Sequence, residues 1–573
     1  MRRRKGQTMN KQEIDARYAA WCASATRDPD LAADLAAMRD NEAAKEDAFY
    51  CDLAFGTAGL RGVIGAGTNR MNVYTVGRAT EGLAAYVMAH FPPERRAVAI
   101  SYDSRIKSDL FARTAAGIFA AHGITVYIYP ALMPVPCLSY AVRTLHCAAG
   151  VMITASHNPS KYNGYKAYGP DGCQIAEGAA DEILACINRV DLFGGIPFTD
   201  FEEGVRAGLI RYTAPSVEDG FIREVLGQTM LAPGEVIDRD VAIVYSPLNG
   251  AGLHPVLRAL TEAGFTNVTV VKEQKQPDGH FPTCPYPNPE IREAMALGME
   301  YAAREKADLL LATDPDCDRV GIAVRNTEGE YVLLTGNETG LLLLDYICSR
   351  RRANGTMPQD PVLVKTVVTT DLADRIAASY GVRTINVLTG FKFIGEQIAR
   401  LEAAGHPESY ILGFEESYGY LSGTYVRDKD AVNASFLICE MFAYYKTHGV
   451  GLYEKLQEIY RTYGYCLNTL RSFAFEGAAG FDKMRAIMQA FRSPIAEIGG
   501  HAVKDCVDYA KGIDGLPCSD VLKFHLAGDC SVVVRPSGTE PKLKLYISVS
   551  AGDRAAALRE TEGILNALAG YFA

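Results

Sequence analysis

The sequence predicts an α/β protein with three similar mixed α/β domains built on βαβ units and a smaller C-terminal α+β domain. Three observations lead to this prediction: a pattern of strand, helix, glycine and strand that occurs three times, a different apolar pattern near the C-terminus, and a length of 573 residues. A chain of that length exceeds what one hydrophobic core supports. Hydrophobic residues at 48% and charged residues at 22% are typical of a globular protein.

The repeated pattern predicts three βαβ units. Each copy consists of an apolar run, an amphipathic stretch, a glycine that ends a helix, and a second apolar run. The paired apolar runs are 98–103 with 124–128, 241–246 with 268–271, and 361–366 with 384–388. The copies lie too far apart for a solenoid, so they favour three separate domains of similar fold.

The two ends of the chain have patterns of their own. Residues 11–47 are rich in alanine and charged residues, which indicates a helical extension. From about Ser472, short alternating apolar runs precede a final helical stretch, as in an α+β domain. We therefore expect a helical extension at 1–50 and four domains, whose expected limits are 51–213, 214–335, 336–463 and 472–573.

Composition and charge narrow the class of protein. A net charge of −10 disfavours nucleic acid or a membrane surface as partner. No apolar segment is long enough to span a bilayer. The fourteen cysteines form no Cys-x-x-Cys pair and no Cys/His cluster at zinc spacing, so we do not expect a metal–thiolate site. We expect a cytoplasmic protein with reduced thiols, and the sequence predicts no particular oligomeric state.

The first candidate site is a serine loop within residues 151–159. An apolar run predicts a strand whose carboxyl end presents the hydroxyl of Ser156, and a proline stops strand pairing just after it. The alternative to a reactive serine is an ordinary turn, in which the side chains of Thr154, Ser156 and Asn158 make hydrogen bonds to the backbone. A hydrolase triad is disfavoured, because no Gly-x-Ser-x-Gly elbow is present and His157 is adjacent to the serine in sequence.

The second candidate site is a metal loop that contains Asp314, Asp316 and Asp318, directly after the apolar run 307–313. Three neighbouring carboxylates raise one another's pKa, and a bound cation resolves this conflict. Three oxygen ligands with room for phosphate and water suit Mg²⁺ better than a softer metal. A solvated acidic turn is the alternative. Arg319 follows the last aspartate directly and offers a charge-assisted contact to a phosphoryl group bound beside the metal.

A third candidate site is a glycine-flanked loop that carries Glu415 and Ser417. Carboxylate and hydroxyl groups provide the acceptors and the donor that hold neighbouring sugar hydroxyls. The segment Thr389-Gly-Phe-Lys-Phe393 is a second recognition loop in the same predicted domain. Taken alone, the motif with Glu415 and Ser417 would more often be an ordinary loop.

The fourth candidate site is a phosphate cradle in residues 532–542. Arg535, Ser537, Thr539 and Lys542 lie on a glycine-containing turn whose backbone N–H groups can converge on an anion. The Walker A pattern Gly-x₄-Gly-Lys-Ser/Thr is absent, so the turn does not imply ATP. No Gly-x-Gly-x-x-Gly follows a strand, which argues against a dinucleotide.

Together the four sites supply a hydroxyl nucleophile, a metal site, a loop that binds sugar hydroxyls (the hydroxyl-reading loop) and a phosphate cradle. Phosphoryl transfer needs mainly positioning and neutralisation of charge, which these parts provide. The order and the residues of these motifs resemble the α-D-phosphohexomutase superfamily. A further motif near the start, Phe55-Gly-Thr-Ala-Gly-Leu-Arg-Gly62, shares this resemblance. The resemblance extends from about residue 50 to the C-terminus and is greatest to phosphoglucomutases of the phosphoglucomutase-2-like bacterial branch.

The resemblance implies four domains around a central cleft and a mutase that acts on sugar phosphates. Ser156 would carry a phosphoryl group, and Mg²⁺ would be held by that group and the three aspartates. The expected reaction interconverts α-D-glucose 1-phosphate and D-glucose 6-phosphate, with glucose 1,6-bisphosphate as intermediate and activator. Phosphomannomutase, phosphopentomutase and glucose-1,6-bisphosphate synthase activities are the alternatives. A sugar-phosphate-binding regulator without catalysis is another class, which retention of the serine and the aspartates argues against.

The resemblance also assigns roles residue by residue. The expected catalytic residues are Ser156, His157, Lys166, Arg61 and Arg319. The expected substrate-binding residues are Thr389, Gly390, Lys392, Glu415, Ser417, Arg427, Lys429, Arg535, Ser537, Gly538, Thr539 and Lys542. Some relatives have Gly-His after the Glu-x-Ser motif, whereas this chain has Tyr418-Gly419 there. The identity of the general base in each half-reaction therefore stays open.

Overall fold

The computed structural model describes residues 9–56, 59–475, 477–513, 515–536 and 542–572, without the side chains of 477–479. The chain divides into two compact units, each assembled from separate stretches of sequence. The first unit holds residues 1–228, 239–321 and 424–436, and the second holds 229–238, 322–423 and 437–573. In the described part of the chain, no helix combines the length and apolar character needed to cross a bilayer.

Three helices begin the first unit: α1 (Lys11–Ser24), α2 (Pro29–Met38) and α3 (Glu42–Phe49). Each follows a polar residue whose side chain accepts a hydrogen bond from the first turn, the usual signal for a helix start. Asn10 forms a capping box with Glu13 at α1, and Asp28 caps α2. These caps explain locally why the alanine-rich extension is helical, as its composition predicted.

The single tryptophan fastens this extension to the domain that follows. Trp21 is 1% exposed and packs edge-to-face against Phe49, Tyr74 and Phe193, with ring centroids 5.5–5.8 Å apart. Tyr74 lies on α4 (Val73–His90), the first long helix after the extension. Aromatic rings in this arrangement bury a large apolar area, so the extension is part of the first unit's core.

The first sheet has the strand order β1-β5-β4-β2-β3-β6. Its strands are β1 (Leu60–Val63), β2 (Ala97–Tyr102), β3 (Thr125–Ile128), β4 (Ala149–Ile153), β5 (Tyr162–Tyr168) and β6 (Ile210–Tyr212). The helices around it are α4 (Val73–His90), α5 (Ser108–Ala121), α6 (Val135–Thr144), α7 (Glu177–Ile187), α8 (Phe201–Arg206) and α9 (Pro215–Leu226). Strand β4 pairs in parallel with β2 and antiparallel with β5, so the chain reverses direction immediately after β4.

The second sheet has the order β11-β10-β9-β7-β8. Its strands are β7 (Ile243–Ser246), β8 (Val268–Val270), β9 (Leu309–Thr313), β10 (Val320–Arg325) and β11 (Tyr331–Leu334). The accompanying helices are α10 (Leu253–Glu262), α11 (Lys272–Lys275) and α12 (Arg292–Glu305). All five residues of β9 are buried, which agrees with the continuous apolar run in the sequence.

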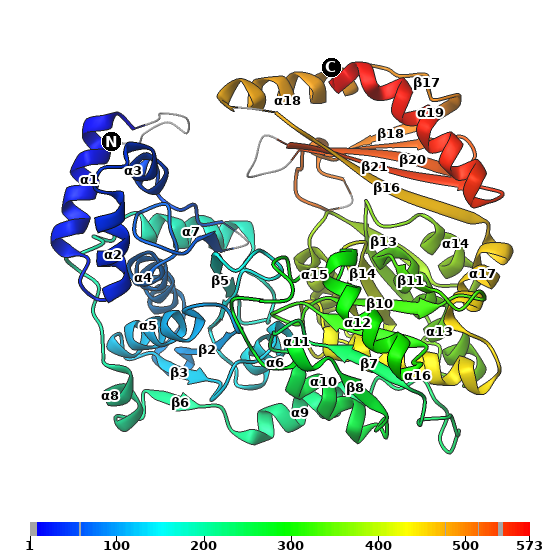
Figure 1. The fold of residues 1–573 in the computed structure, drawn as a ribbon, viewed down its shortest axis with the longest axis horizontal. Helices are drawn as coiled ribbons and strands as arrows, with labels where there is room; N and C mark the ends of the chain where they lie inside the picture. Colours follow the sequence, from blue (N-terminus) through cyan, green and yellow to red (C-terminus); the bar gives the residue numbers. More distant parts are fainter. Residues whose placement is uncertain (1–8, 57–58, 476, 514, 537–541, 573) are drawn as a thin grey trace. The chain divides into compact units, whose positions relative to one another are not determined.

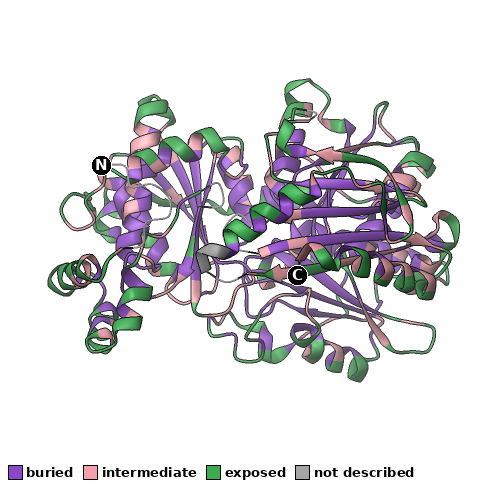
Figure 2. Cartoon of the chain, turned by 90° about the horizontal axis from the view of Figure 1, so that it is seen from above, coloured by how far each residue is buried: buried purple, intermediate pink, exposed green. Residues whose placement is uncertain are grey.

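The third sheet lies in the second unit and has the order β13-β12-β14-β15. Its strands are β12 (Val362–Thr366), β13 (Arg383–Val387), β14 (Tyr410–Glu415) and β15 (Gly419–Leu421). The associated helices are α13 (Gly336–Ala353), α14 (Leu372–Ser379), α15 (Phe391–Ala403), α16 (Ala431–Thr447) and α17 (Leu452–Tyr463). Figure 2 shows the pattern that the strands and helices share: strands are buried, while helices expose one face.

The predicted βαβ repeat is confirmed in all three sheets. Strands β2 and β3, β7 and β8, and β12 and β13 are parallel neighbours, and each pair is joined by a helix. The joining helices are α5, α10 and α14, and each is followed by a glycine with positive φ: Gly123, Gly264 and Gly381. The chain therefore repeats one supersecondary unit in three places.

The fourth sheet differs, as predicted for an α+β domain, and has the order β16-β21-β20-β19-β18-β17. Its strands are β16 (Tyr465–Ala474), β17 (Glu497–Ile498), β18 (His501–Asp508), β19 (Leu522–Leu526), β20 (Cys530–Pro536) and β21 (Lys542–Ala551). All neighbouring strands in this sheet pair antiparallel. Helices α18 (Gly477–Phe491) and α19 (Arg554–Phe572) lie on the same side of this sheet (Figure 1).

A buried charge network joins the third and fourth sheets within the second unit. Asp371 accepts a hydrogen bond from Lys523 Nζ at 2.7 Å and another from Ser531 Oγ at 2.6 Å. The buried Lys365 ammonium lies 3.5 Å from Asp371 and 3.3 Å from Asp374. Burial alone would raise the pKa of Asp371, but the charges of Lys523 and Lys365 outweigh it and hold that pKa well below its usual range.

We expect Asp371→Asn to destabilise the protein by about 3–5 kcal/mol, because the change leaves two buried ammonium groups without their shared counter-charge. The midpoint of urea unfolding measures this loss. Because the folded pKa of Asp371 is depressed, its contribution is present above its unfolded pKa of about 4 and is lost as pH falls below that value.

Asp374→Asn is the matched control for this prediction. Among the described residues, the Asp374 side chain pairs with Lys365 and not with Lys523, and it is more exposed, with a side-chain exposure of 38% against 24% for Asp371. We expect it to cost clearly less stability. Equal midpoints for the two variants would contradict the assignment of Asp371 as the centre of the network.

Candidate active site

The Ser156 loop follows β4, where the sequence predicted it. Ser156 has φ +51°, in the left-handed region that residues other than glycine rarely adopt. Its N–H donates to Thr154 Oγ1 at 2.8 Å, and the Thr154 hydroxyl in turn donates to Asp103 Oδ2 at 2.6 Å. Asp103 lies just after β2 and is 1% exposed. The serine is therefore held in an uncommon backbone conformation by a neighbouring strand end.

Arg105 is a positioning residue that the sequence motifs did not indicate. Its Nη1 donates to the carbonyl oxygens of Pro159 and Tyr162 at 3.0 Å, and its Nη2 donates to those of Ser156 and Asn158. One buried guanidinium thus satisfies four carbonyls of the serine loop. The available signal was an acid and an arginine directly after a predicted strand, which is too common a pattern to be specific.

The three aspartates lie together at the end of β9. Asp314, Asp316 and Asp318 are all buried, and one carboxylate oxygen from each lies within 4.8 Å of the others. Asp314 Oδ1 accepts hydrogen bonds from the backbone N–H groups of Asp318 and Arg319 at 3.1 and 3.0 Å. Ser156 Oγ donates to Asp314 Oδ2 at 2.9 Å, so the first two predicted sites are one site.

The electrostatics of this cluster favour a bound cation. Burial and the charges of Asp316 and Asp318 raise the pKa of Asp314 well above its usual value. Asp316 Oδ1 is buried and, among the described residues, has no hydrogen-bond partner. A buried carboxylate oxygen without a partner is costly, and a metal ion would satisfy it. The three side chains therefore fit a hard divalent metal ion.

Two lysines complete the surroundings of the aspartates. Lys166 on β5 places Nζ 2.8 Å from Asp316 Oδ2, and Lys429 places Nζ 3.1 Å from Asp318 Oδ2. Burial would raise the pKa of Asp318, but Lys429, Lys166 and Arg319 together hold it well below its usual value. For Lys166, burial lowers the pKa, and the charges of Asp316 and Asp318 outweigh this effect and raise it.

Asp428 holds Lys429 in place and was not among the predicted site residues. It contacts Lys429 Nζ at 3.0 Å and accepts hydrogen bonds from Tyr168 at 2.9 Å and Gln174 at 3.0 Å. Tyr168 lies two residues after Lys166, on the same face of β5. One strand therefore supplies a lysine to the aspartates and, through Asp428, positions the second lysine.

His157, Arg61 and Arg319 also lie around the serine loop. His157 Nδ1 is 3.1 Å from Ser156 Oγ, and burial, followed by the charges of Arg319 and Arg61, holds the pKa of His157 well below its usual value. Arg61 donates to Asn158 Oδ1 at 3.2 Å, and Arg319 donates to Glu290 Oε1 at 2.5 Å. A phosphoryl group on Ser156 would therefore be surrounded by cationic side chains.

Arg427 occupies a different environment from the one expected of a substrate-binding residue. Its side chain is fully buried, and its Nη1 donates to the carbonyl oxygens of Thr424 and Val426. Its backbone N–H donates to Ser139 Oγ at 2.9 Å. These contacts tie the loop that carries Lys429 to α6, and contact of Arg427 with substrate stays a prediction.

The predicted sugar-reading loops lie in the second unit. Glu415, the last residue of β14, accepts a hydrogen bond from the N–H of Gly390 at 2.9 Å. This contact brings the loop around Glu415 together with the segment that contains Thr389, Gly390 and Lys392. Thr389 Oγ1 is buried without a hydrogen-bond partner among the described residues. Ser417 is half-buried, two residues after Glu415.

The predicted phosphate cradle is described only at its edges. Arg535 lies near the end of β20 and Lys542 begins β21, and both are half-buried. Arg535 lies close enough to Tyr546 of β21 to contribute to its pKa, which burial raises to about 12. The other expected cradle residues, Ser537, Gly538 and Thr539, lie outside the described residues.

Comparison with known protein families matches four successive stretches of the chain to the phosphoglucomutase/phosphomannomutase family. Residues 52–193, 220–329 and 335–463 match its alpha/beta/alpha domains I, II and III, and residues 482–562 match its C-terminal domain. A phosphoglucomutase from Staphylococcus saprophyticus is 36% identical over 509 residues, which cover 87% of this chain and 90% of that protein. One from Staphylococcus aureus strain USA300 is 37% identical, covering 88% and 91%.

Solved structures with lower identity share the fold. A putative phosphomannomutase from Thermus thermophilus superposes with a TM-score of 0.67 at 22% identity, covering 91% of this chain and 99% of that one. The open form of the Paramecium phosphoprotein parafusin has a TM-score of 0.67 at 18% identity, covering 91% and 96%. The four domain matches and the two Staphylococcus relatives show that the chain belongs to the phosphoglucomutase/phosphomannomutase family. It is a phosphohexomutase, an enzyme of the isomerase class.

Proposed function

We propose that this enzyme is a phosphoglucomutase, which interconverts α-D-glucose 1-phosphate and D-glucose 6-phosphate through a phosphorylated Ser156 and glucose 1,6-bisphosphate. The observation that carries the proposal is the 2.9 Å contact of Ser156 Oγ with Asp314, at the edge of a buried aspartate cluster flanked by lysines. The phosphoglucomutases at 36–37% identity support glucose phosphates as substrates. A cytoplasmic location and small-molecule partners are consistent with the net charge of −10.

In the proposed reaction, phosphorylated Ser156 gives its phosphoryl group to the free hydroxyl of a sugar phosphate. Mg²⁺ held by Asp314, Asp316 and Asp318 would neutralise charge on that group when bound. Arg61 and Arg319 offer N–H donors to its oxygens. The sugar bisphosphate then turns around and returns its other phosphoryl group to Ser156, which regenerates the starting enzyme.

We assign proton transfer for the acceptor hydroxyl to Lys166, with His157 in a supporting role. Lys166 is one of the buried basic groups beside the aspartate cluster, and an amine that exchanges a proton there serves both directions of the reaction. His157 is within hydrogen-bond distance of Ser156 Oγ, and burial, followed by the charges of Arg319 and Arg61, holds its pKa well below the usual value.

The remaining predicted residues would bind the part of the substrate that does not react. Glu415 and Ser417 would contact sugar hydroxyls that look alike in both orientations, with Thr389, Gly390 and Lys392 beside them. Lys429 and Arg427 would lie near the same sugar. The distal phosphate would be held by the cradle residues Arg535, Ser537, Gly538, Thr539 and Lys542. We retain the proposed domain limits 51–213, 214–335, 336–463 and 472–573, after the extension at 1–50.

A comparison of substrates tests this function directly. We expect kcat/KM for α-glucose 1-phosphate to exceed that for mannose 1-phosphate and ribose 1-phosphate by about tenfold or more, because the hydroxyl-reading loop discriminates through individual hydrogen bonds. Each assay should contain Mg²⁺ and the matching sugar bisphosphate. A higher kcat/KM for either competitor would replace glucose in the proposal. Failure of the protein to take up a phosphoryl group, judged by intact mass, would favour a non-catalytic regulator.

A further inference from the structure

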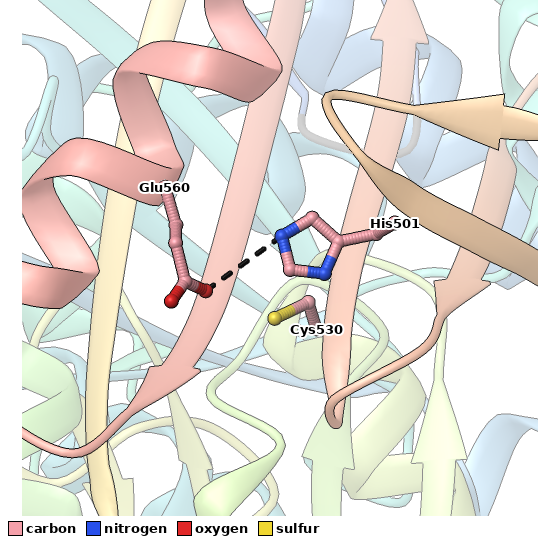
Figure 3. A group of neighbouring side chains, drawn as sticks. All are labelled: His501, Cys530 and Glu560. Carbon is pink, nitrogen blue, oxygen red and sulfur yellow. Dashed lines mark ion pairs between the residues drawn. The ribbon is translucent and has the colours of Figure 1, made fainter.

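Three side chains that commonly bind metals converge in the C-terminal domain, in a group that the proposed mutase reaction does not use. His501 is the first residue of β18, Cys530 is the first residue of β20, and Glu560 lies on α19. Their ligand atoms lie within 4.8 Å of one another, and His501 Nε2 is 3.6 Å from Glu560 Oε2. Figure 3 shows the carboxylate facing the imidazole ring, with the Cys530 sulfur beside them.

Tight backbone turns fix the positions of the histidine and the cysteine. Gly499 and Gly500, with φ +60° and +86°, turn the chain immediately before His501. A Cβ at Gly499 would lie 2.7 Å from the Cα of Ile564, so this turn packs directly against α19. Glu560 precedes Ile564 by four residues and therefore lies one turn away on the same helix face. Cys530 directly follows a second turn, at Gly528 and Asp529.

A hydrogen bond orients the imidazole ring for metal binding. His501 Nδ1 lies 3.1 Å from the carbonyl oxygen of Ala527. A carbonyl oxygen only accepts hydrogen bonds, so Nδ1 must carry the proton, and in a neutral ring Nε2 then carries the lone pair. In protein metal sites, a backbone carbonyl often accepts this hydrogen bond and so orients the metal-binding histidine.

The same hydrogen bond creates a conflict of charge that a cation would resolve. With Nδ1 donating to Ala527, the Nε2 lone pair of a neutral His501 faces the carboxylate of Glu560 at 3.6 Å. Two electron-rich groups at this distance repel each other unless a proton or a metal ion lies between them. The sulfur of the buried Cys530 lies at the same place and provides a third metal-binding atom. A proton shared by His501 and Glu560 would not require this third atom, whereas a metal ion would use it.

We propose that His501, Cys530 and Glu560 form a second metal site, which takes a borderline divalent cation such as Zn²⁺ and leaves a fourth position for water. Nitrogen, sulfur and carboxylate oxygen form a ligand set typical of Zn²⁺, whereas Mg²⁺ prefers the all-oxygen aspartate cluster. On binding, the Cys530 thiol loses its proton to solvent and a metal–sulfur bond forms. The bound ion links α19 to β18 and β20 and so stabilises the C-terminal domain.

The spacing of ligands along the sequence gave no sign of this site. Zinc motifs are recognised in sequence by pairs of ligands a few residues apart. Here the three ligands come from two strands and a helix that are separated in the chain, so only folding brings them together. The sequence-based expectation that the protein has no metal–thiolate site is therefore one that this proposal would overturn.

Titration of the full-length protein with Co²⁺, in excess Mg²⁺, tests the proposal. Thiolate bound to Co²⁺ gives a charge-transfer absorption in the near ultraviolet, which the all-oxygen aspartate site cannot give. We expect this band to saturate at one equivalent of Co²⁺, to be displaced by Zn²⁺, and to be absent in Cys530→Ser. It should persist in Cys506→Ser and Cys518→Ser, which change exposed cysteines of the same domain.

Zinc affinity provides a second readout that does not depend on the cysteine variant folding. Glu560 is partly exposed, so Glu560→Gln should fold normally while weakening Zn²⁺ binding by about 10- to 100-fold. His501→Gln should weaken it at least as much. The matched controls are Glu562→Gln, on the same helix, and His525→Gln, on β19, and neither should change the affinity.

At one fixed Zn²⁺ concentration, the ion should also raise the thermal unfolding midpoint of the wild-type protein and of both control variants by more than that of Glu560→Gln. A thiolate band that persists in Cys530→Ser, or Zn²⁺ affinity that is unchanged in both Glu560→Gln and His501→Gln, would overturn the proposal. So would the absence of any thiolate band in the wild-type protein, which would leave His501 and Glu560 as a simple ion pair. None of these outcomes affects the aspartate cluster or the proposed mutase function.

Discussion

Replacing Ser156 by alanine is expected to reduce mutase activity by about 10⁴-fold or more, because the change removes the hydroxyl oxygen that is proposed to carry the phosphoryl group. The backbone around Ser156 is fixed by Thr154, Asp103 and Arg105, which do not depend on the serine hydroxyl. The variant should therefore fold normally and still bind sugar phosphates. Activity is measured as conversion of α-glucose 1-phosphate in the presence of glucose 1,6-bisphosphate.

Ser160→Ala is the matched control, since Ser160 lies in the same loop, four residues further along the chain. It should keep nearly full activity. Intact-mass measurement after incubation with glucose 1,6-bisphosphate should show one added phosphoryl group in the wild-type protein and in Ser160→Ala, and none in Ser156→Ala. Normal turnover or phosphorylation of Ser156→Ala would show that another residue carries the group.

The fold was largely predictable because its signals are local. Runs such as 98–103 and 361–366 are mostly apolar, as expected for strands of a buried parallel sheet, and a glycine marks the end of each following helix. Pairing over longer distances was harder to predict. Strand β16 at Tyr465–Ala474 pairs along its whole length with β21, yet its exposed and half-buried residues lack a clear apolar pattern.

In the active site too, the local motifs were predictable from the sequence, whereas the contacts between them were not. The sequence indicated Ser156 and the aspartates because each group follows an apolar run that predicts a strand. Their 2.9 Å contact depends on tertiary structure, since the serine and Asp314 are 158 residues apart in the chain. Arg105 and Asp428 were missed for a related reason: each acts by positioning another residue, and the contacts through which it does so form only on folding.

Asp316→Asn is expected to lower Mg²⁺ affinity and to reduce activity by about 100-fold or more at a fixed, moderate Mg²⁺ concentration. Asparagine keeps the shape of the side chain but replaces a charged oxygen pair with one neutral oxygen and an amide. The side chain then offers hard Mg²⁺ a weaker ligand, at the position where Asp316 Oδ1 has no hydrogen-bond partner among the described residues. Activity as a function of Mg²⁺ concentration measures the effect.

Glu328→Gln provides the control, because it makes the same change of charge on the exposed turn between β10 and β11. Its Mg²⁺ dependence should be that of the wild-type protein. The shape of the Asp316→Asn response separates two roles of this carboxylate, which also lies 2.8 Å from Lys166 Nζ. Recovery of activity at high Mg²⁺ would identify metal binding as the main role. A loss that no concentration of Mg²⁺ restores would assign the effect to Lys166, whose ammonium would have lost its nearest counter-charge, and would contradict the prediction.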